Sequence, residues 1–329
     1  MPILIPEILF AIGKQIIENG KSENDVVKFV ISGKESLKAA RNVFASVKNL
    51  KINHCHFAIG WKKEYSEYNF LKIPKCLMYC IGGSVKKLYI KQQINPFFQP
   101  IIDTVIEKKQ LISFSTSSKF YECEDILFLK NFLPQFSKTL KELSIPNQAM
   151  SGILRDSLRL KTLIFQNGCN RGLYFMLRPF PNTNEKSPFL SSVEHLLFKD
   201  ISGHLHSSFD NYISVIKLFP SLKRLDFITI CKDLNSLEID IKVLSKLIKR
   251  TKYEFPQNVI YNVLLQKPLL NEIETILLNG VCSKFKYDSS NPKYHCFERS
   301  MLKKETFSSE ISRRKLLVYI PKSKFYVER

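Results

Sequence analysis

The sequence has no long uninterrupted apolar run. A membrane-spanning helix needs about 20 consecutive apolar residues, whereas the apolar stretches in this chain are short and are broken by Lys or Glu. The first residues also lack the basic segment and the small-residue cleavage site of a secretory signal, and they carry Pro2, Pro6 and Glu7 instead. We therefore expect no membrane association and a location in the cytoplasm or the nucleus.

Arginine and acidic residues are scarce relative to lysine. The 50 basic residues exceed the 30 acidic ones by 20, which gives a net charge of +20. Such a charge could indicate a nucleic-acid partner. However, Arg is the residue preferred for bidentate phosphate recognition, and the lysines are spread along the whole chain. These two observations favour a general lysine bias, and nucleic-acid binding remains an alternative.

The sequence lacks a clear framework for disulfide bonds, although its eight cysteines form an even number. In a chain of 329 residues without a secretion signal, we expect reduced and mostly buried thiols. A zinc site is the alternative. Its candidate ligands are His54, Cys55, His56, Cys76 and Cys80. We expect no metal and no cofactor, because Cys55 occupies a position linked to the repeat pattern, as do Cys169, Cys231 and Cys282.

Three short helices are predicted within the first fifty residues. The first helix has Pro6 in its first turn, where a missing N–H costs nothing, and a carboxylate beside it at the positive end of the helix dipole. A second helix follows the weak capping residue Ser22, and a third is expected to begin at Ser32, where Glu35 would complete a capping box. Three such helices cannot bury all their apolar residues on each other, so they need the rest of the chain or another protein.

This N-terminal stretch resembles an F-box. Residues 5–9, with the sequence IPEIL, approximate the start of that motif, and residues 25–34 supply an acidic residue, an apolar run and a step similar to Val-Ser-Lys. The resemblance covers residues 3–47 and implies docking to a Skp-type adaptor on a cullin scaffold. The residues that it assigns to the adaptor surface are Ile5, Pro6, Ile8, Leu9, Val26 and Val30. The alternative is an N-terminal cap that shields the first repeat of an array.

A six-residue pattern then recurs along the chain. Its first, fourth and sixth positions are apolar, and the positions between them are spacers. Copies start at residues 47, 85, 111, 140, 160, 193, 222, 273 and 313, with a degenerate copy at 248. The last two apolar residues of each copy lie on one face of a short strand, because alternate strand residues share a face. The segments between copies, such as residues 100–107, 128–133 and 212–219, have apolar residues at helical spacing.

Together these features resemble a leucine-rich repeat protein with periods in the range of 20–29 residues plus insertions. The expected fold is α/β, a leucine-rich repeat solenoid in which short parallel strands alternate with helices. A helical F-box-like module is expected at residues 1–46, and the array with a C-terminal cap at residues 47–329. An ordinary α/β domain is the alternative. In each copy, the last two apolar residues would face the core, and the residue between them would face outward. These outward residues would form a concave face that binds a target protein: Lys51, Tyr89, Ser144, Ile164, Leu197, Asp226 and Leu277.

No motif with catalytic chemistry emerges from the sequence. Residues 20–22, with the sequence GKS, lack the glycine that a phosphate-binding loop requires at position 15, where Gln15 stands. Glu238 and Asp240 share one face of an extended segment without a partner histidine. The absence of such motifs leads us to expect a binding protein and not an enzyme, and the resemblance to an F-box implies a substrate-recruiting subunit of a cullin–RING ubiquitin ligase. A repeat scaffold without a ligase link and a basic nucleic-acid-binding protein are the alternatives.

Overall fold

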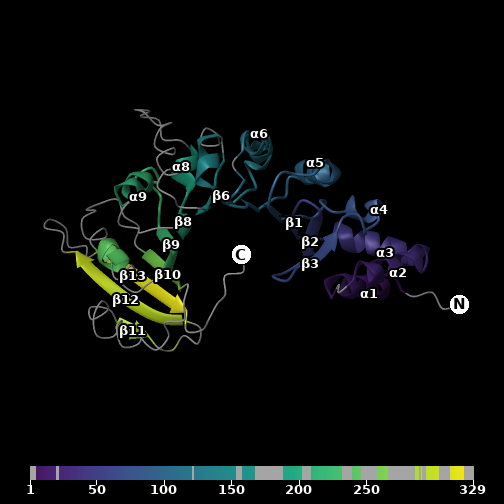
Figure 1. Cartoon of the computed structure of the whole chain (residues 1–329), viewed down its shortest axis with the longest axis horizontal. Coiled ribbons are helices and arrows are strands. Elements are labelled where there is room, and N and C mark those ends of the chain that lie inside the picture. The colour runs from purple at the N-terminus through teal and green to yellow at the C-terminus, as the bar shows by residue number, and fades with distance from the viewer. Residues whose placement is uncertain are drawn as a thin grey trace. The chain divides into compact units, whose positions relative to one another are not determined.

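The computed structural model describes residues 5–19, 22–120, 122–152, 158–166, 188–201, 209–231, 239–245, 258–265, 286–288, 290, 294–303 and 312–321. The chain is α/β, with a mostly parallel sheet whose strands alternate with helices (Figure 1). It divides into two compact units. Unit 1 comprises Met1–Ile145 and Asp156–Arg159, and unit 2 comprises Pro146–Arg155 and Leu160–Arg329. The described part of the chain holds no helix that is long and apolar enough to cross a membrane.

Unit 1 begins with three helices, α1 (Pro6–Glu18), α2 (Glu23–Ile31) and α3 (Lys34–Ala45). The side chain of Ser22 accepts a hydrogen bond of 3.1 Å from the amide of Asn24 and caps α2, so the weak signal is confirmed. The expected capping box at Ser32 is wrong, since α3 is capped by Gly33 without a side-chain bond. The hydroxyl of Ser32 instead donates to the carbonyl of Phe29 at 2.7 Å, which makes this residue the end of α2.

The sheet of unit 1 has the strand order β6-β5-β4-β1-β2-β3. Its parallel part consists of β1 (Asn49–Ile52), β4 (Lys87–Ile90), β5 (Ser113–Thr116) and β6 (Glu142–Pro146). An antiparallel hairpin of β2 (His56–Gly60) and β3 (Ser66–Asn69) extends it. The helical connections are α4 (Lys75–Met78), η1 (Pro96–Phe98), α5 (Gln99–Lys108), α6 (Cys123–Phe132) and η2 (Leu133–Phe136).

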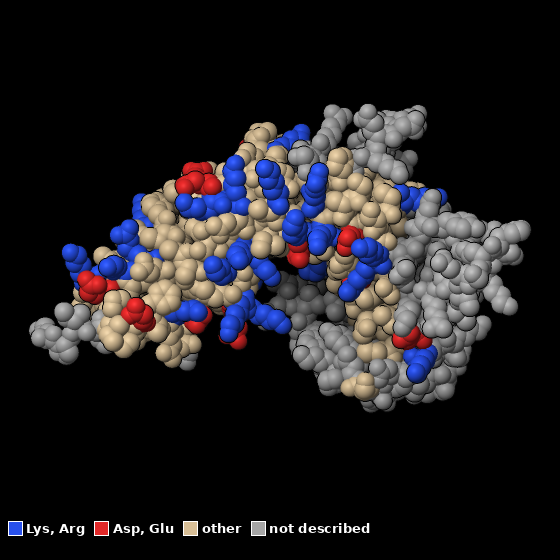
Figure 2. Space-filling view, turned by 180° about the vertical axis from the view of Figure 1, so that it is seen from behind, with Lys and Arg blue, Asp and Glu red and all other residues tan. Residues whose placement is uncertain are grey.

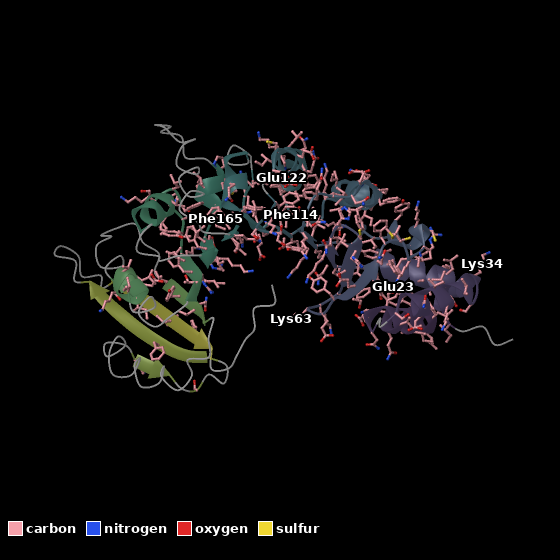
Figure 3. All side chains as sticks on the ribbon, in the orientation of Figure 1. Glu23, Lys34, Lys63, Phe114, Glu122 and Phe165 are labelled. Atoms are coloured by element: carbon pink, nitrogen blue, oxygen red, sulfur yellow. The ribbon has the colours of Figure 1, made fainter. Side chains whose placement is uncertain are left out.

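The strand register of unit 1 aligns the inward residues of the repeat copies. The row of cross-strand neighbours contains Leu50, Leu88, Phe114 and Leu143, all of them buried. Phe132 of α6 packs on Phe114 with ring centroids 5.2 Å apart, and Figure 3 labels Phe114 within this sheet. Each such buried side chain contributes about 1.5–3 kcal/mol relative to its exposure to water, so this row holds helices and strands together.

Unit 2 continues the same plan with the strand order β11-β12-β13-β10-β9-β8-β7. Five strands are parallel: β7 (Thr162–Gln166), β8 (His195–Ile201), β9 (Arg224–Cys231), β10 (Asn258–Leu265) and β13 (Ser312–Pro321). Antiparallel to β13 lies β12 (Tyr294–Lys303), which pairs with β11 (Lys286–Asp288). The described helices of unit 2 are η3 (Asn147–Gly152), α8 (Pro188–Ser192) and α9 (Phe209–Ile216), and residues 239–245 are also helical.

The core of unit 2 is built on stacked phenylalanines. Phe165, Phe198 and Phe227 occupy equivalent positions on β7, β8 and β9, with ring centroids 5.4 and 5.5 Å apart. Tyr212 of α9 meets the second and third of these rings edge-on. Tyr212 is almost completely buried, and its ring packs between the helix and the sheet. This arrangement uses the favourable edge-to-face geometry of aromatic pairs.

The structure confirms the α/β class and most of the predicted strands. The copies that start at residues 47, 85, 111, 140, 160, 193 and 222 form parallel strands, and the copy at 313 lies in β13. The predicted helices at 100–107, 128–133 and 212–219 correspond to α5, α6 and α9. The copies at 248 and 273 lie outside the described residues. The sequence pattern missed β10 and the antiparallel strands, because their residues do not follow the repeat spacing.

Candidate protein-interaction surfaces

Helix α1 presents a stripe of isoleucines to solvent. Ile5, just before the helix, is 57% exposed, and Ile8 and Ile12 are 45% and 39% exposed. Their spacing of three and four residues places them on one side of the helix. Leu9 and Ile17 lie on the other side and are buried. The helix therefore has two apolar sides, of which only one packs within the described part of the chain.

The structure corrects part of the predicted adaptor surface. Ile5, Pro6 and Ile8 are exposed, in agreement with such a surface. In contrast, Leu9, Val26 and Val30 are buried, and Val26 is completely inaccessible. The reason is that α1, α2 and α3 pack on one another and use these three side chains for their own core. The sequence could not distinguish the two apolar sides of α1, although Ile12 extends the exposed stripe by one turn.

The three helices are joined to the sheet by specific polar contacts. The hydroxyl of Tyr68 on β3 donates a hydrogen bond of 2.6 Å to the carbonyl of Ile17 on α1. The carboxylate of Glu23, labelled in Figure 3, accepts from the amide of Asn69 at 3.2 Å. Burial raises the pKa of Tyr68, so this phenol stays protonated and able to donate. The helices and the first strands thus belong to one compact unit.

The predicted concave-face residues of unit 1 lie on the sheet face opposite the inward row, but they differ in exposure. Lys51 is exposed, and its ammonium group lies 3.7 Å from the centre of the Tyr65 ring. Tyr89 is its neighbour on β4 and is half-buried, and burial raises the pKa of that phenol. Ser144 is only 6% exposed, which contradicts the expectation of a solvated side chain. Lys51, Tyr65 and Tyr89 are therefore the accessible residues of this group.

In unit 2 the outward face carries a buried acid among basic side chains. Asp226 on β9 belongs to this outward face, as predicted for its strand position, but only 2% of its surface is exposed. Arg224, two residues earlier on the same strand, donates two hydrogen bonds to its carboxylate, at 2.8 and 2.7 Å. The Nε2 atom of His195 on β8 lies 3.1 Å from the same carboxylate. Ile164 and Leu197 are half-buried, and Leu277 lies outside the described residues.

The charge on Asp226 is stabilised by these contacts. Burial would raise the pKa of this carboxyl, but the hydrogen bonds from His195 and Arg224 outweigh burial and hold the pKa below its usual range. The pKa of Arg224 is raised in turn by its bonds to Asp226. On the sheet, Leu197 is the cross-strand neighbour of Asp226. The result is a hydrogen-bonded polar group next to a half-buried aliphatic residue.

The cysteines of the described residues are less buried than expected. Cys76 and Cys123 are exposed, and Cys55, Cys80 and Cys296 are half-buried. The expectation of mostly buried thiols is therefore wrong for this part of the chain. Several of these residues lie where the regular elements leave side chains uncovered, with Cys55 between β1 and β2 and Cys123 at the first position of α6. Within the described ranges, no group of three or more His, Cys, Asp or Glu residues is arranged to hold a metal ion.

Comparison with known proteins adds no assignment. No protein-family model matches the chain, and no curated protein matches it. The surfaces described above must therefore be judged by their own geometry and chemistry.

Proposed function

We propose that this protein is a recognition subunit of a cullin–RING ubiquitin ligase, built as a leucine-rich repeat solenoid with an F-box-like N-terminal module. In this role, the N-terminal helices dock a Skp-type adaptor on the cullin scaffold, and the repeat strands hold a target protein. The chemistry of ubiquitin transfer belongs to other subunits, so the chain itself acts by binding. Such a role places the protein in the cytoplasm or the nucleus.

The observation that carries this proposal is the exposed isoleucine stripe of α1. Ile5, Ile8 and Ile12 are exposed at helical spacing on a helix that already packs its other side against α2 and α3. An amphipathic helix that presents such a row is suited to lie in a hydrophobic groove of a partner. The IPEIL sequence at residues 5–9, which resembles the start of an F-box, supplies Ile5 and Ile8 to this stripe, while its Leu9 lies on the buried side. We therefore assign the adaptor contact to Ile5, Pro6, Ile8 and Ile12.

The target surface is proposed on the outward side of the parallel strands. In unit 1 it comprises Lys51, Tyr65 and Tyr89, and in unit 2 it comprises Ile164 and Leu197 beside the Asp226 group. Tyrosine suits such a surface because it combines a large contact area with few rotatable bonds. The short strands present these side chains from a sheet with a fixed register, which limits the conformational entropy lost on binding.

Co-purification with a Skp-type adaptor tests the proposal. The adaptor should be retained by the wild-type chain and lost by the double variant Ile8→Asp and Ile12→Asp, because two buried charges would face an apolar groove. Both positions are exposed in the free protein, so the variant should fold normally. Leu9 must be left unchanged in this test, since its side chain belongs to the helical core.

A matched control is the variant Leu71→Asp, because Leu71 is an exposed apolar residue of unit 1 that lies outside the N-terminal helices. This control should retain the adaptor. Circular dichroism of all three proteins should show the same unfolding temperature. Failure of the wild-type protein to bind any Skp-type adaptor in a purified system would reject the ligase assignment and leave a repeat scaffold without that link.

A further inference from the structure

The tertiary structure gathers lysines that are far apart in the sequence. The parallel strands β1, β4, β5 and β6 all begin at the same edge of the unit 1 sheet, which we call the entry edge. Backbone hydrogen bonds connect the residues just before these strands. The amide of Lys86 donates to the carbonyl of Lys48, that of Ile112 to Lys86, and that of Lys141 to Ile112, each at 2.8 Å. Backbone hydrogen bonds therefore link the residues of the entry edge continuously across the four strands.

Nearly every connection into these strands supplies lysines. We define the lysine row as the lysines of these connections and of the first residues of the strands. Its members are Lys48, Lys86, Lys87, Lys108, Lys109, Lys138 and Lys141. All are exposed except Lys48, which is half-buried. The β2–β3 hairpin adds Lys62 and Lys63 beside β1, because the amide of Lys48 donates to the carbonyl of Gly60. Figure 3 labels Lys63 on this hairpin.

The opposite ends of the same strands are not similarly basic. The residues that follow β1, β4 and β5 include only two lysines, Lys91 and Lys119, and the chain then reaches the exposed carboxylates of Glu122 and Glu124. Figure 2 shows a molecular face on which the Lys and Arg side chains predominate over Asp and Glu. The two ends of these strands thus differ in charge, and the lysines are concentrated at the entry edge.

The lysine row has almost no internal partners. Among the described residues, Lys108 is its only member with an ion pair, to Glu107 at 2.8 Å. The other carboxylate at this edge, that of Glu142, accepts a hydrogen bond from Ser113. A concentration of unpaired ammonium groups raises the local electrostatic potential and disfavours the compact state by mutual repulsion, unless an anionic partner compensates for it.

We propose that the lysine row binds the phosphate backbone of a nucleic acid. Neighbouring strands lie about 4.8 Å apart, so the four strands span about 14 Å. A duplex carries one phosphate charge per about 1.7 Å of its helix axis, or about eight over this distance. An extended acidic peptide presents side chains on one face only about every 6.7 Å, or two to three carboxylates. The seven lysines therefore match the charge density of a nucleic-acid backbone better than that of a peptide.

The composition of the row also defines the kind of recognition. It contains lysines and no arginine, so it offers point charges in place of the bidentate fork that recognises guanine edges or single phosphates. Contacts of this type position a nucleic acid without distinguishing its sequence. The proposed binding is therefore independent of sequence and strongly dependent on salt. It uses residues other than those assigned to the adaptor and the target protein. Its test is therefore independent of the proposed role in a ubiquitin ligase.

Fluorescence anisotropy with the full chain tests the inference. The probes are a labelled 20-nucleotide single-stranded RNA, the corresponding single-stranded DNA, its duplex and a 20-residue polyglutamate peptide. At least one nucleic acid should bind, and its affinity should fall at least tenfold between 50 and 200 mM salt. The triple variant Lys86→Glu, Lys87→Glu and Lys141→Glu should bind at least tenfold more weakly and reduce the salt slope by about 2–3. The three oligonucleotides distinguish RNA from DNA and single from double strands.

The matched control reverses three exposed lysines of α2 and α3 through Lys28→Glu, Lys34→Glu and Lys38→Glu. Both triple variants change the net charge by −6, so they differ only in the place of the change. The control should keep the wild-type affinity within about threefold. Equal losses in both variants, the absence of binding to all oligonucleotides, or tighter binding of polyglutamate than of any nucleic acid would overturn the proposal. Glutamine substitutions at the same positions serve as a second series if the glutamate variants fold poorly.

Discussion

The hydroxyl of Tyr68 on β3 donates a hydrogen bond of 2.6 Å to the carbonyl of Ile17 on α1, and both residues are buried. The carbonyl belongs to the last turn of α1, where the regular helical hydrogen-bonding pattern ends. Through this bond the sheet satisfies the end of a helix that lies about fifty residues earlier in the chain. The N-terminal helices and the β2–β3 hairpin thus stabilise each other.

The variant Tyr68→Phe should lower the free energy of unfolding of unit 1 by about 1–3 kcal/mol, because it removes a short buried hydrogen bond between the sheet and α1. Chemical unfolding monitored by circular dichroism measures this loss. Tyr65→Phe is the control, since Tyr65 is exposed and should contribute less than about 0.5 kcal/mol. Equal stability of Tyr68→Phe and the wild type would contradict the importance of this bond.

Two adjacent glycines before β4 should respond very differently to substitution. Gly82 has a φ of +114°, and an added Cβ atom would lie 2.9 Å from the Cβ of Thr104 on α5. Gly83 has open space around such an atom. We expect Gly82→Ala to cost about 1–3 kcal/mol of stability through backbone strain and the close contact. Gly83→Ala should change stability by less than about 1 kcal/mol, so thermal melting of the two variants provides an internal control.

Asp226 predicts a specific dependence of stability on pH. Its pKa is lowered in the folded protein, because the hydrogen bonds from His195 and Arg224 outweigh burial. A lowered folded pKa gives a stability contribution that is complete above the unfolded value of about 3.9 and is lost as the pH falls through the folded pKa. Asp226→Asn should therefore cost about 1.5–3 kcal/mol at pH 7, as expected for hydrogen bonds to a charged group.

The difference between the wild type and Asp226→Asn should shrink as the pH is lowered from 5 to 2. Urea unfolding at several pH values measures this difference, and Asp25→Asn, at an exposed position of α2, is the control. A difference that does not change with pH would show that the carboxylate makes no charge-dependent contribution.

The exposed cysteines should react rapidly with a thiol reagent in the native state. Cys76 and Cys123 are exposed free thiols, whereas Cys55, Cys80 and Cys296 are half-buried. The double variant Cys76→Ser and Cys123→Ser should lower the number of rapidly reacting thiols by two relative to the wild type. Denatured wild-type protein should titrate with eight free thiols if none forms a disulfide bond. An unchanged rapid phase in the double variant would contradict the exposure of these two residues.

The spacing of apolar residues along the chain is enough to assign the inward rows of the sheet. Leu50, Leu88, Phe114 and Leu143 could be assigned from spacing alone, because burial of alternate residues is a local property of a strand and leaves a pattern in the sequence. The helix of residues 99–108 could be predicted for the same reason, since its apolar residues recur at helical spacing. Strands outside the repeat, such as β10, could not be assigned in this way, because their residues do not follow the spacing of the repeat copies.

Which apolar and charged residues remain accessible depends on the packing of elements that are remote along the chain. Leu9 and Ile8 are adjacent and chemically similar, yet Leu9 is buried by α2 and α3 while Ile8 faces solvent, because burial depends on where other helices pack. Lys48 and Lys141 are almost a hundred residues apart, yet the parallel strands bring their connections to one edge. A sequence contains the charge of each lysine but not its distance from the others, since that distance is set by hydrogen bonds between strands that are remote along the chain.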